Sequence, residues 1–329
     1  MERIDIAVVG AGPCGIAVGA AAAKAGRQAV LFDKGCITDS IVQYPYYMRF
    51  FSTADKLEVG GVPWSVPEKN PSRREALVYY RGVVDHFGME VRQYEEVTEV
   101  TGKEGEFVLS TRRMSGEEAR YEAKFVVVAT GGFQAPNLLG VEGEELPKVL
   151  HYYREPHPFY DQDVVVVGGS NSAVESSLEL FRAGARVTLV HFLDELDPGV
   201  KPWVIPDITN RLDRGEIDVF WRHRVAKVTP GTVVLRHEET GEERTLENDW
   251  LLAMTGWSSD PVLLRELGVA VDEATGVPAH DPETMETNVP GVFIAGVLAA
   301  GNDANKIFIE NGRAHGSQIV EALTEAGKI

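Results

Sequence analysis

Short apolar runs alternate with helical stretches along the chain. Residues 4–9 (IDIAVV) form a largely apolar run, which is typical of a strand buried on both faces of a parallel sheet. A glycine-rich turn follows, and an alanine-rich helix is predicted from about residue 13 to 25, ended by Gly26. A second strand is predicted at 29–33 (AVLFD). Together these segments predict one βαβ unit.

The same pattern recurs in the middle of the chain. Residues 164–167 (VVVV) predict a buried strand, residues 168–173 (GGSNSA) a tight turn, and residues 172–183 a helix that Gly184 ends. The next strand is predicted at 187–191 (VTLVH). Two such units predict an α/β fold with two Rossmann-like, three-layer ββα dinucleotide-binding domains.

The remaining pattern suggests how the two domains are connected. A helix is expected at 72–87, strands and turns at 91–127, buried strands near 125–132, 250–257 and 292–296, and a final helix at 305–324. Prolines 136 and 147 flank a crossing between domains, and residues 258–261 suit the return. We therefore expect one dinucleotide-binding domain at 1–140 and 258–329, interrupted by a second dinucleotide-binding domain at 141–257.

Composition narrows the class of protein. A formal net charge of -18 over 329 residues argues against a nucleic-acid partner, which needs a basic face. Only two cysteines occur, so no disulfide framework is expected and a reducing compartment is favoured. The first strand starts too early for a signal peptide, and apolar residues 16–25 are too few to cross a membrane. We expect a cytoplasmic protein with no membrane partner.

The first turn, GAGPCG, has the glycine spacing of a dinucleotide-binding loop. Gly10 permits the tight turn, Gly12 lets a pyrophosphate approach the backbone, and Gly15 lets helix and strand pack closely. The helix N-terminus offers free N–H groups and a positive dipole end. Asp33 ends the second strand, where a carboxylate can accept the ribose hydroxyls.

The second turn lacks an acid after its second strand, where His191 and Phe192 stand instead. An acid would repel a 2′-phosphate, so its absence favours NADPH over NADH. His191 is then a partial basic clamp, with Lys201, Arg222 and Arg224 as further candidates if they fold nearby. The alternative is that His191 merely caps its strand.

Two nucleotide sites in one chain imply that hydride passes from a nicotinamide to a flavin. The chain resembles the two-dinucleotide-binding flavoprotein disulfide reductases over essentially its whole length. The segments that carry the resemblance are GAGPCG, Asp33, VVVATGG, GGSNSAVES, LLAMTG and VPGVFIAG.

A finer resemblance is to the bacillithiol-disulfide reductases of the YpdA type. It rests on the single cysteine in the first glycine loop, Cys14, and on three segments, namely 151–169, Lys201-Pro202-Trp203 and 295–316. One departure concerns Phe192, where the family is expected to have an arginine that contacts NADPH. The resemblance implies FAD and NADPH as cofactors, a small-molecule disulfide as substrate, most closely bacillithiol disulfide, and a homo-oligomer.

The resemblance makes Cys14 the candidate nucleophile, which would attack the disulfide before the reduced flavin resolves the mixed disulfide. A helix N-terminus lowers the pKa of a nearby thiol, while a bound pyrophosphate opposes that effect. The alternative is that Cys14 is only a small residue that fits the loop. Cys36 has no second cysteine after it, so an internal disulfide shuttle is excluded, and Cys36 is most simply a packing residue.

The candidate cofactor-binding residues follow from the motifs. For FAD they are Gly10, Gly12, Pro13, Cys14, Gly15, Asp33, Lys34, Thr130, Gly131, Gly296, Val297 and Glu310. For NADPH they are Gly168, Gly169, Ser170, Asn171, Ser172, Ala173 and His191. No metal-ligand spacing occurs.

Several features stay open. The aromatic stretch 43–52 could cover the flavin, line a substrate groove or be an ordinary core edge, and His151 and His157 could be proton donors or structural. Rival functions are a ferredoxin- or flavodoxin-NADP reductase, which needs no Cys14, a flavin monooxygenase, and a redox sensor that binds both nucleotides without catalysis.

Overall fold

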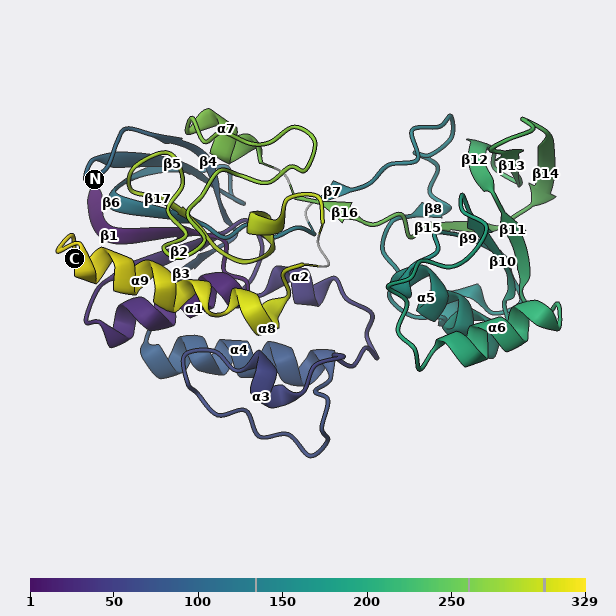
Figure 1. Cartoon of the computed structure of the whole chain (residues 1–329), viewed down its shortest axis with the longest axis horizontal. Helices are drawn as coiled ribbons and strands as arrows, with labels where there is room; N and C mark the ends of the chain where they lie inside the picture. Colours follow the sequence, from purple (N-terminus) through teal and green to yellow (C-terminus); the bar gives the residue numbers. More distant parts are fainter. Residues whose placement is uncertain (134, 260, 304–305) are drawn as a thin grey trace. The chain divides into compact units, whose positions relative to one another are not determined.

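The structure is a computed structural model of the chain and describes residues 1–133, 135–259, 261–303 and 306–329 (Figure 1). It divides into two compact units. The first unit comprises Met1–Gln43, Tyr47–Ala135 and Trp257–Ile329, and the second comprises Tyr44–Tyr46 and Pro136–Gly256. The first crossing thus falls at 135/136, where the sequence suggested 140/141, and the sequence did not anticipate the assignment of residues 44–46 to the second unit.

The first unit is built on a mixed sheet with strand order β3-β2-β1-β6-β5-β4, in which β17 also pairs with β6. Strands β1, β2, β3, β6 and β17 are mutually parallel, while β5 runs antiparallel to both β4 and β6. The bounds are β1 (Glu2–Val9), β2 (Ala29–Asp33), β3 (Glu90–Gln93), β4 (Glu95–Thr101), β5 (Phe107–Arg113), β6 (Glu118–Val128) and β17 (Val292–Ile294).

Helices cover one side of this sheet. Helix α1 packs against β1 and β2 and contacts α4 and α9, and the three helices lie on the same side of the sheet in Figure 1. The predicted helix at 305–324 is two helices, and its first residue lies outside the described part of the chain. The bounds are α1 (Pro13–Lys24), α2 (Asp39–Val42), α3 (Ala54–Leu57), α4 (Arg73–Phe87), α7 (Val262–Glu266), α8 (Ile309–Gly312) and α9 (His315–Glu325), with a 3₁₀ helix at Gly296–Ala300.

The second unit has three layers. A parallel sheet of order β11-β10-β9-β15-β8 lies between helices α5 and α6 and an antiparallel sheet of order β12-β13-β14 (Figure 1). The bounds are β8 (Val149–Leu150), β9 (Asp163–Val167), β10 (Arg186–His191), β11 (Asp218–Trp221), β12 (His223–Val228), β13 (Thr232–His237), β14 (Glu243–Glu247), β15 (Trp250–Ala253), α5 (Asn171–Arg182) and α6 (Ile205–Asp213), with a 3₁₀ helix at His157–Phe159.

Strand β9 shows why the run VVVV is buried on both faces. Val164 and Val166 pack into the core beneath the helices, while Val165 and Val167 pack into the core beneath the antiparallel sheet. Successive side chains of a strand point to opposite faces, so a strand between two layers needs apolar residues at every position. The predicted α/β fold is confirmed.

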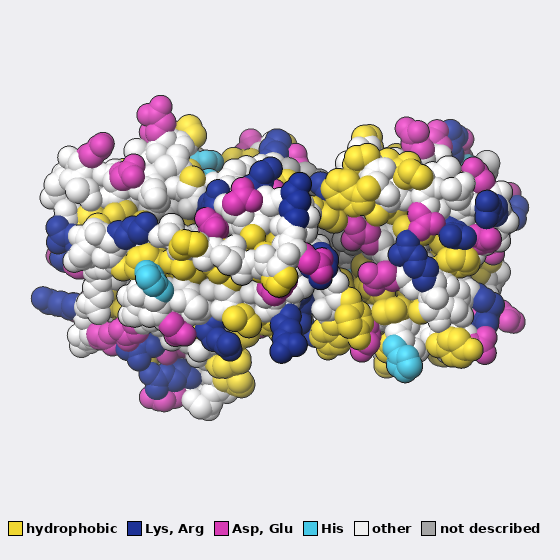
Figure 2. All heavy atoms as spheres, turned by 90° about the horizontal axis from the view of Figure 1, so that it is seen from below, with side chains coloured by type: hydrophobic (Ala, Val, Ile, Leu, Met, Phe, Trp, Pro, Cys, Tyr) yellow, Lys and Arg dark blue, Asp and Glu magenta, His cyan; other side chains and the backbone are white. Residues whose placement is uncertain are grey.

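The two connections between the units pair with each other as β7 (Ala135–Pro136) and β16 (Trp257–Ser258). On the face shown in Figure 2, basic side chains are interspersed with acidic ones. Among the described residues, none of the helices combines the length and the apolar composition that crossing a bilayer requires.

Candidate functional site

The parallel strands of the first unit bring its predicted residues to one edge. The carboxyl ends of parallel strands lie at the same edge of a sheet, and this is where α/β proteins bind ligands. The glycine turn follows β1, Asp33 ends β2, Thr130 and Gly131 follow β6, and Gly296 follows β17. The structure therefore gathers segments that are far apart in the sequence.

The first glycine turn has the shape of a dinucleotide cradle. A Cβ at Gly10 would lie 2.3 Å from the Ala129 carbonyl oxygen, and a Cβ at Gly15 only 2.0 Å from the Gly10 carbonyl oxygen. A Cβ at Gly12, by contrast, would meet nothing within 4 Å. Gly10 and Gly15 are thus required by close packing, while Gly12 leaves open space before the N-terminus of α1. This geometry fits a pyrophosphate that approaches the backbone.

Asp33 holds the turn in place through its carboxylate. Oδ2 accepts a 2.7 Å hydrogen bond from the Ala11 N–H, and Oδ1 accepts a 2.8 Å bond from the Gly35 N–H. Burial raises the pKa of Asp33, and these two hydrogen bonds oppose that rise. Lys34 also opposes it through its charge. Each carboxylate oxygen has further lone pairs, so Asp33 can still accept a ribose hydroxyl.

Cys14 lies in the first turn of α1, but its thiol is enclosed. A Cβ at either Gly296 or Gly312 would lie 2.9 Å from the Cys14 sulfur, so both glycines are needed to make room for it. The residue keeps part of its surface, yet burial raises the pKa of the thiol to about 12. Loss of solvation is the cause of this rise, and it acts against the lowering that a helix N-terminus can produce.

Cys36, the other cysteine, is also a free thiol and is half-buried. Its sulfur lies 3.6 Å from the Asp39 Oδ1 atom, and burial together with this carboxylate raises its pKa. Asp39 and Asp33 both face it, so a thiolate is disfavoured here. This environment suits a structural residue.

His315 supports the turn after β17, which the sequence analysis missed. Its Nδ1 atom accepts a 3.1 Å hydrogen bond from the Gly296 N–H. Burial lowers the pKa of His315 to about 4, with a smaller contribution from His280, so the ring is neutral. A Cβ at Gly132 would lie 3.1 Å from the Cγ1 atom of Val297, which follows Gly296. The sequence signal for the missed residue, His315, was the segment NGRAHG.

Glu310 joins the aromatic stretch 43–52 to the C-terminal part of the unit. The Ser52 hydroxyl donates a short hydrogen bond to Glu310, and the Lys56 ammonium lies 3.8 Å from the same carboxylate. Arg313 adds hydrogen bonds from its guanidinium to the carbonyls of Asp55 and Glu58. Glu310 is therefore held by this loop, and its role towards FAD stays a prediction.

The second glycine turn repeats the backbone of the first. A Cβ at Gly168 would lie 2.4 Å from the Met254 carbonyl oxygen. Ser170 precedes α5, whose first residues are Asn171 and Ser172. The Asn171 side chain accepts a 2.9 Å hydrogen bond from the Lys201 N–H and donates a 3.0 Å bond to the Gly199 carbonyl. The segment that begins with Lys201 is thus anchored on this turn.

His191 lies buried against the second turn. A Cβ at Gly169 would lie 2.4 Å from its ring, and only 2% of the residue is exposed. Burial lowers the pKa of His191, so the imidazole is neutral at pH 7. Its Nε2 atom is 3.5 Å from the Asp197 Oδ1 atom, too far for an ordinary hydrogen bond. These observations favour the alternative that His191 is structural, and its predicted role as a partial basic clamp stays untested.

The two histidines that the sequence offered as proton donors lie in the second unit. The Nε2 atom of His151 is 3.5 Å from the Glu144 Oε1 atom, whereas His157 is exposed in a 3₁₀ helix. Their role as proton donors stays a prediction. Among the described residues, no group of His, Cys, Asp and Glu is placed to hold a metal ion.

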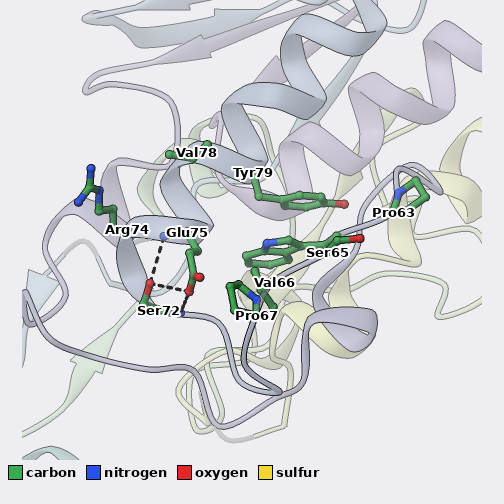
Figure 3. Close-up of a pocket in the computed structure, with 10 residues that line it drawn as sticks. Pro63, Ser65, Val66, Pro67, Ser72, Arg74, Glu75, Val78 and Tyr79 are labelled. Atoms are coloured by element: carbon green, nitrogen blue, oxygen red, sulfur yellow. Dashed lines mark hydrogen bonds between the residues drawn. The ribbon is translucent and has the colours of Figure 1, made fainter.

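A cavity of about 690 Å3 lies in the first unit beside the start of α4 (Figure 3). Two charged residues line this cavity. The Ser72 N–H donates a 2.7 Å hydrogen bond to the Glu75 Oε2 atom, and the Arg74 side chain points away from the cavity in Figure 3. None of the described residues that line the cavity is a predicted site residue. They are Pro63, Trp64, Ser65, Val66, Pro67, Ser72, Arg74, Glu75, Val78 and Tyr79.

Two Rossmann-like units, each with a glycine turn at the carboxyl edge of a parallel sheet, give the chain a thioredoxin reductase-like fold. The family model for pyridine nucleotide-disulphide oxidoreductase matches residues 7–296. The chain belongs to this family and is an enzyme. Membership implies the use of a flavin and a nicotinamide cofactor.

Similar proteins have narrower descriptions. The chain is 43% identical to bacilliredoxin reductase Bdr of Bacillus subtilis (strain 168), over 97% of each chain. The structure of bacillithiol disulfide reductase Bdr (YpdA) from Bacillus cereus matches with a TM-score of 0.96 and 41% identity, over 99% of this chain and 100% of that one. The Staphylococcus aureus Bdr (YpdA) matches with a TM-score of 0.92 and 40% identity, over 99% of each.

Proposed function

We propose that the chain uses NADPH and FAD to reduce the disulfide of a low-molecular-weight thiol, and that bacillithiol disulfide is its substrate. The observation that carries the proposal is the place of Cys14, a lone thiol within the first glycine turn of a pyridine nucleotide-disulphide oxidoreductase. The proteins named as bacillithiol disulfide reductases are 40% and 41% identical to the chain. We place the reaction in the cytoplasm, because both cysteines are free thiols.

The residues of the first turn would hold FAD. Gly12 leaves open space for the pyrophosphate, the N-terminus of α1 faces it, and Asp33 accepts the ribose hydroxyl. Gly168, Gly169, Ser170 and the start of α5 would hold NADPH in the second unit. When bound, the two cofactors supply the two electrons that disulfide reduction requires.

The Cys14 sulfur would attack one sulfur of the disulfide and form a mixed disulfide, which releases the other half as a thiolate that takes up a proton. Two electrons and two protons then return Cys14 to its thiol and release the second thiol molecule. Burial keeps Cys14 protonated in the structure, so the reaction requires its pKa to fall when the cofactor or the substrate binds. His315, neutral beside Gly296, orders the loop around Cys14.

The test is NADPH consumption by the flavin-loaded enzyme with bacillithiol disulfide, glutathione disulfide and cystine in turn. We expect bacillithiol disulfide to be preferred, and mass spectrometry of acid-quenched enzyme to find a bacillithiol adduct on Cys14. Equal rates with all three disulfides would contradict the substrate, and an adduct confined to Cys36 would contradict the nucleophile.

The burial of Cys14 favours one second candidate. A thiol with a raised pKa is a poor nucleophile, and a ferredoxin- or flavodoxin-NADP reductase would need none. That candidate predicts that Cys14→Ser still reduces a flavodoxin at the full rate. The homo-oligomer implied by the resemblance stays a prediction.

A further inference from the structure

The second unit lacks the arginine that the family resemblance leads one to expect at position 192, yet it places another cation there. The Cζ atom of Arg224 lies 4.4 Å from the centre of the Phe192 ring. Phe192 follows β10 directly and is 42% exposed. The carboxyl end of the second strand in such a unit is where an adenosine ribose binds.

A chain of contacts links Arg224 to the glycine turn. The His191 ring lies against Gly169, and the rings of His191 and Phe192 have centroids 4.8 Å apart. Arg224 stacks on Phe192 in turn. The cation therefore stands beside the strand end that follows the turn, where the neutral, buried His191 offers no charge.

The backbone fixes this arrangement. β11 ends at Trp221, and Arg222 then adopts a left-handed conformation with φ of 57°. The Arg222 N–H donates a 2.9 Å hydrogen bond to the Leu193 carbonyl, and its own carbonyl accepts a 2.8 Å bond from the Glu238 N–H. β12 is thus tied to the end of β10 at the point where it carries Arg224.

The other cations near this edge are already engaged by acids. Arg222 lies 2.8 Å from Asp194 and 2.7 Å from Glu239, and so pairs with two carboxylates. The charge of Lys201 acts on Glu175, whose pKa it lowers against the effect of burial. Both cations therefore already have negative charge to balance.

Among the described residues, Arg224 has a single acidic partner, Glu238, at 3.0 Å, and the side chain is 58% exposed. Exposed ion pairs of this kind are weak, so a doubly charged phosphate can displace the carboxylate. An arginine stacked on an aromatic ring has its N–H groups directed outwards in a plane, ready for a phosphate.

We infer that Arg224, stacked on Phe192, binds the 2′-phosphate of the nicotinamide dinucleotide and so selects NADPH over NADH. The inference rests on the proposed function, in that a nicotinamide dinucleotide binds at the second turn. The inference goes beyond the proposed function because it names the residue that binds the 2′-phosphate. That residue lies on β12, outside the glycine motif.

The test uses the flavin-loaded enzyme and two probes, adenosine 2′,5′-bisphosphate and adenosine 5′-diphosphate, titrated by calorimetry. Arg224→Gln should weaken the bisphosphate by about tenfold and leave the diphosphate within about twofold. Phe192→Leu should weaken the bisphosphate by a smaller factor, because the cation remains but loses its position. Glu238→Gln should strengthen it, because a competing carboxylate is removed.

Arg236→Gln is the matched control. Arg236 is also 58% exposed and paired with one carboxylate, Glu243 at 2.7 Å, but on β13. We expect it to change neither affinity. An Arg224→Gln enzyme whose ratio of the two affinities stays within about twofold of wild type would overturn the inference, as would a wild-type enzyme that binds both probes equally.

A separate assay tests the proposed function: the reduction of the bound flavin by NADPH or NADH is measured. An enzyme whose flavin neither nucleotide reduces has lost the proposed function, while the ratio of probe affinities still decides the role of Arg224. An enzyme that reduces disulfides equally well with NADH overturns only the role of Arg224.

Discussion

The two glycine turns have the same backbone conformation at their first residue but carry different small residues at the positions that follow. In GAGPCG and GGSNSA, Gly10 and Gly168 both have a positive φ, of 114° and 141°, and both N–H groups donate to a carbonyl of the next strand. In both cases an added Cβ would clash with a backbone carbonyl oxygen, that of Ala129 after β6 or that of Met254 after β15. This position is therefore dictated by the fold, whatever the turn binds.

The second position of each turn depends on the residue that ends the following strand. In the first unit it is Ala11, whose N–H reaches the short Asp33 carboxylate. In the second unit it is Gly169, because the His191 ring fills the space where a Cβ would stand. The comparison teaches that the strand-end residue, rather than the turn alone, decides what each unit can bind.

The largest difference between the turns should appear at their fifth position, when the reactivity of Cys14 is compared with that of a cysteine introduced in place of Ser172. Cys14 and Ser172 both stand second in their helices, but Ser172 is exposed and Cys14 is enclosed. With the pKa of Cys14 at about 12, we expect a thiolate fraction at pH 8 about a thousandfold below that of an ordinary thiol.

The measurement is the rate of alkylation by iodoacetamide in two single-thiol proteins. One is Cys36→Ala, and the other is Cys14→Ala/Cys36→Ala/Ser172→Cys. The rate at Cys14 should rise about tenfold per pH unit up to pH 10, because only the thiolate reacts. A rate at pH 8 equal to that of the residue introduced at 172 would contradict the burial of Cys14.

The second largest difference should be the effect of a methyl group at the sixth position of each turn on stability. Gly15→Ala places a Cβ 2.0 Å from the Gly10 carbonyl, so we expect a loss of about 3 kcal/mol in unfolding free energy and of bound flavin. Ala173→Gly, at the matching position, should cost about 1 kcal/mol. Urea unfolding checks both, and equal losses would contradict the difference in packing.

Substitutions of the two strand-end residues, Asp33 and His191, should differ less in their effect on unfolding free energy. Asp33→Asn leaves one acceptor oxygen for two N–H groups, which should cost about 1–3 kcal/mol and weaken retention of flavin. His191→Leu should change stability by less than about 1 kcal/mol, because neither ring nitrogen has a hydrogen-bond partner among the described residues. Chemical unfolding of both variants tests this contrast; a larger loss in His191→Leu would reverse it.

The smallest effect concerns the helices. Ala17 of α1 matches Glu175 of α5, whose pKa burial and Glu179 raise to about 7. The folded state binds this proton more tightly than the unfolded chain does, so stability falls as pH rises from about 4.5 to 7. Glu175→Gln should therefore stabilise the protein by about 1–2 kcal/mol at pH 8, with little effect at pH 5. Thermal unfolding at both pH values measures it; an equal gain at both would contradict the raised pKa.

The sequence predicted the parts of the fold that follow from periodicity. β2 has its predicted bounds, and α1 and α5 end within a residue of prediction, because apolar runs and glycine stops are local signals. Sequence-based prediction did not include α6, although Ile205, Ile208 and Leu212 have helical spacing. It also missed the sheet β12-β13-β14, because its strands are short and partly charged.

For the candidate site, the sequence predicted positions better than environments. The glycines and Asp33 lie where their motif requires. The burial of Cys14 could not be predicted, because it depends on Gly296 and Gly312, which approach from almost 300 residues further along the chain. The buried state of His191 depends in the same way on packing beneath Gly169.

The most direct test of the central claim is a pair of half-reactions in the flavin-loaded Cys14→Ala enzyme, with Cys36→Ala as its matched control. NADPH is added without oxygen, and then one equivalent of bacillithiol disulfide, while flavin absorbance is recorded. We predict that NADPH bleaches the flavin in both variants and that the disulfide restores its colour only in Cys36→Ala. Restoration at the same rate in Cys14→Ala would contradict the account.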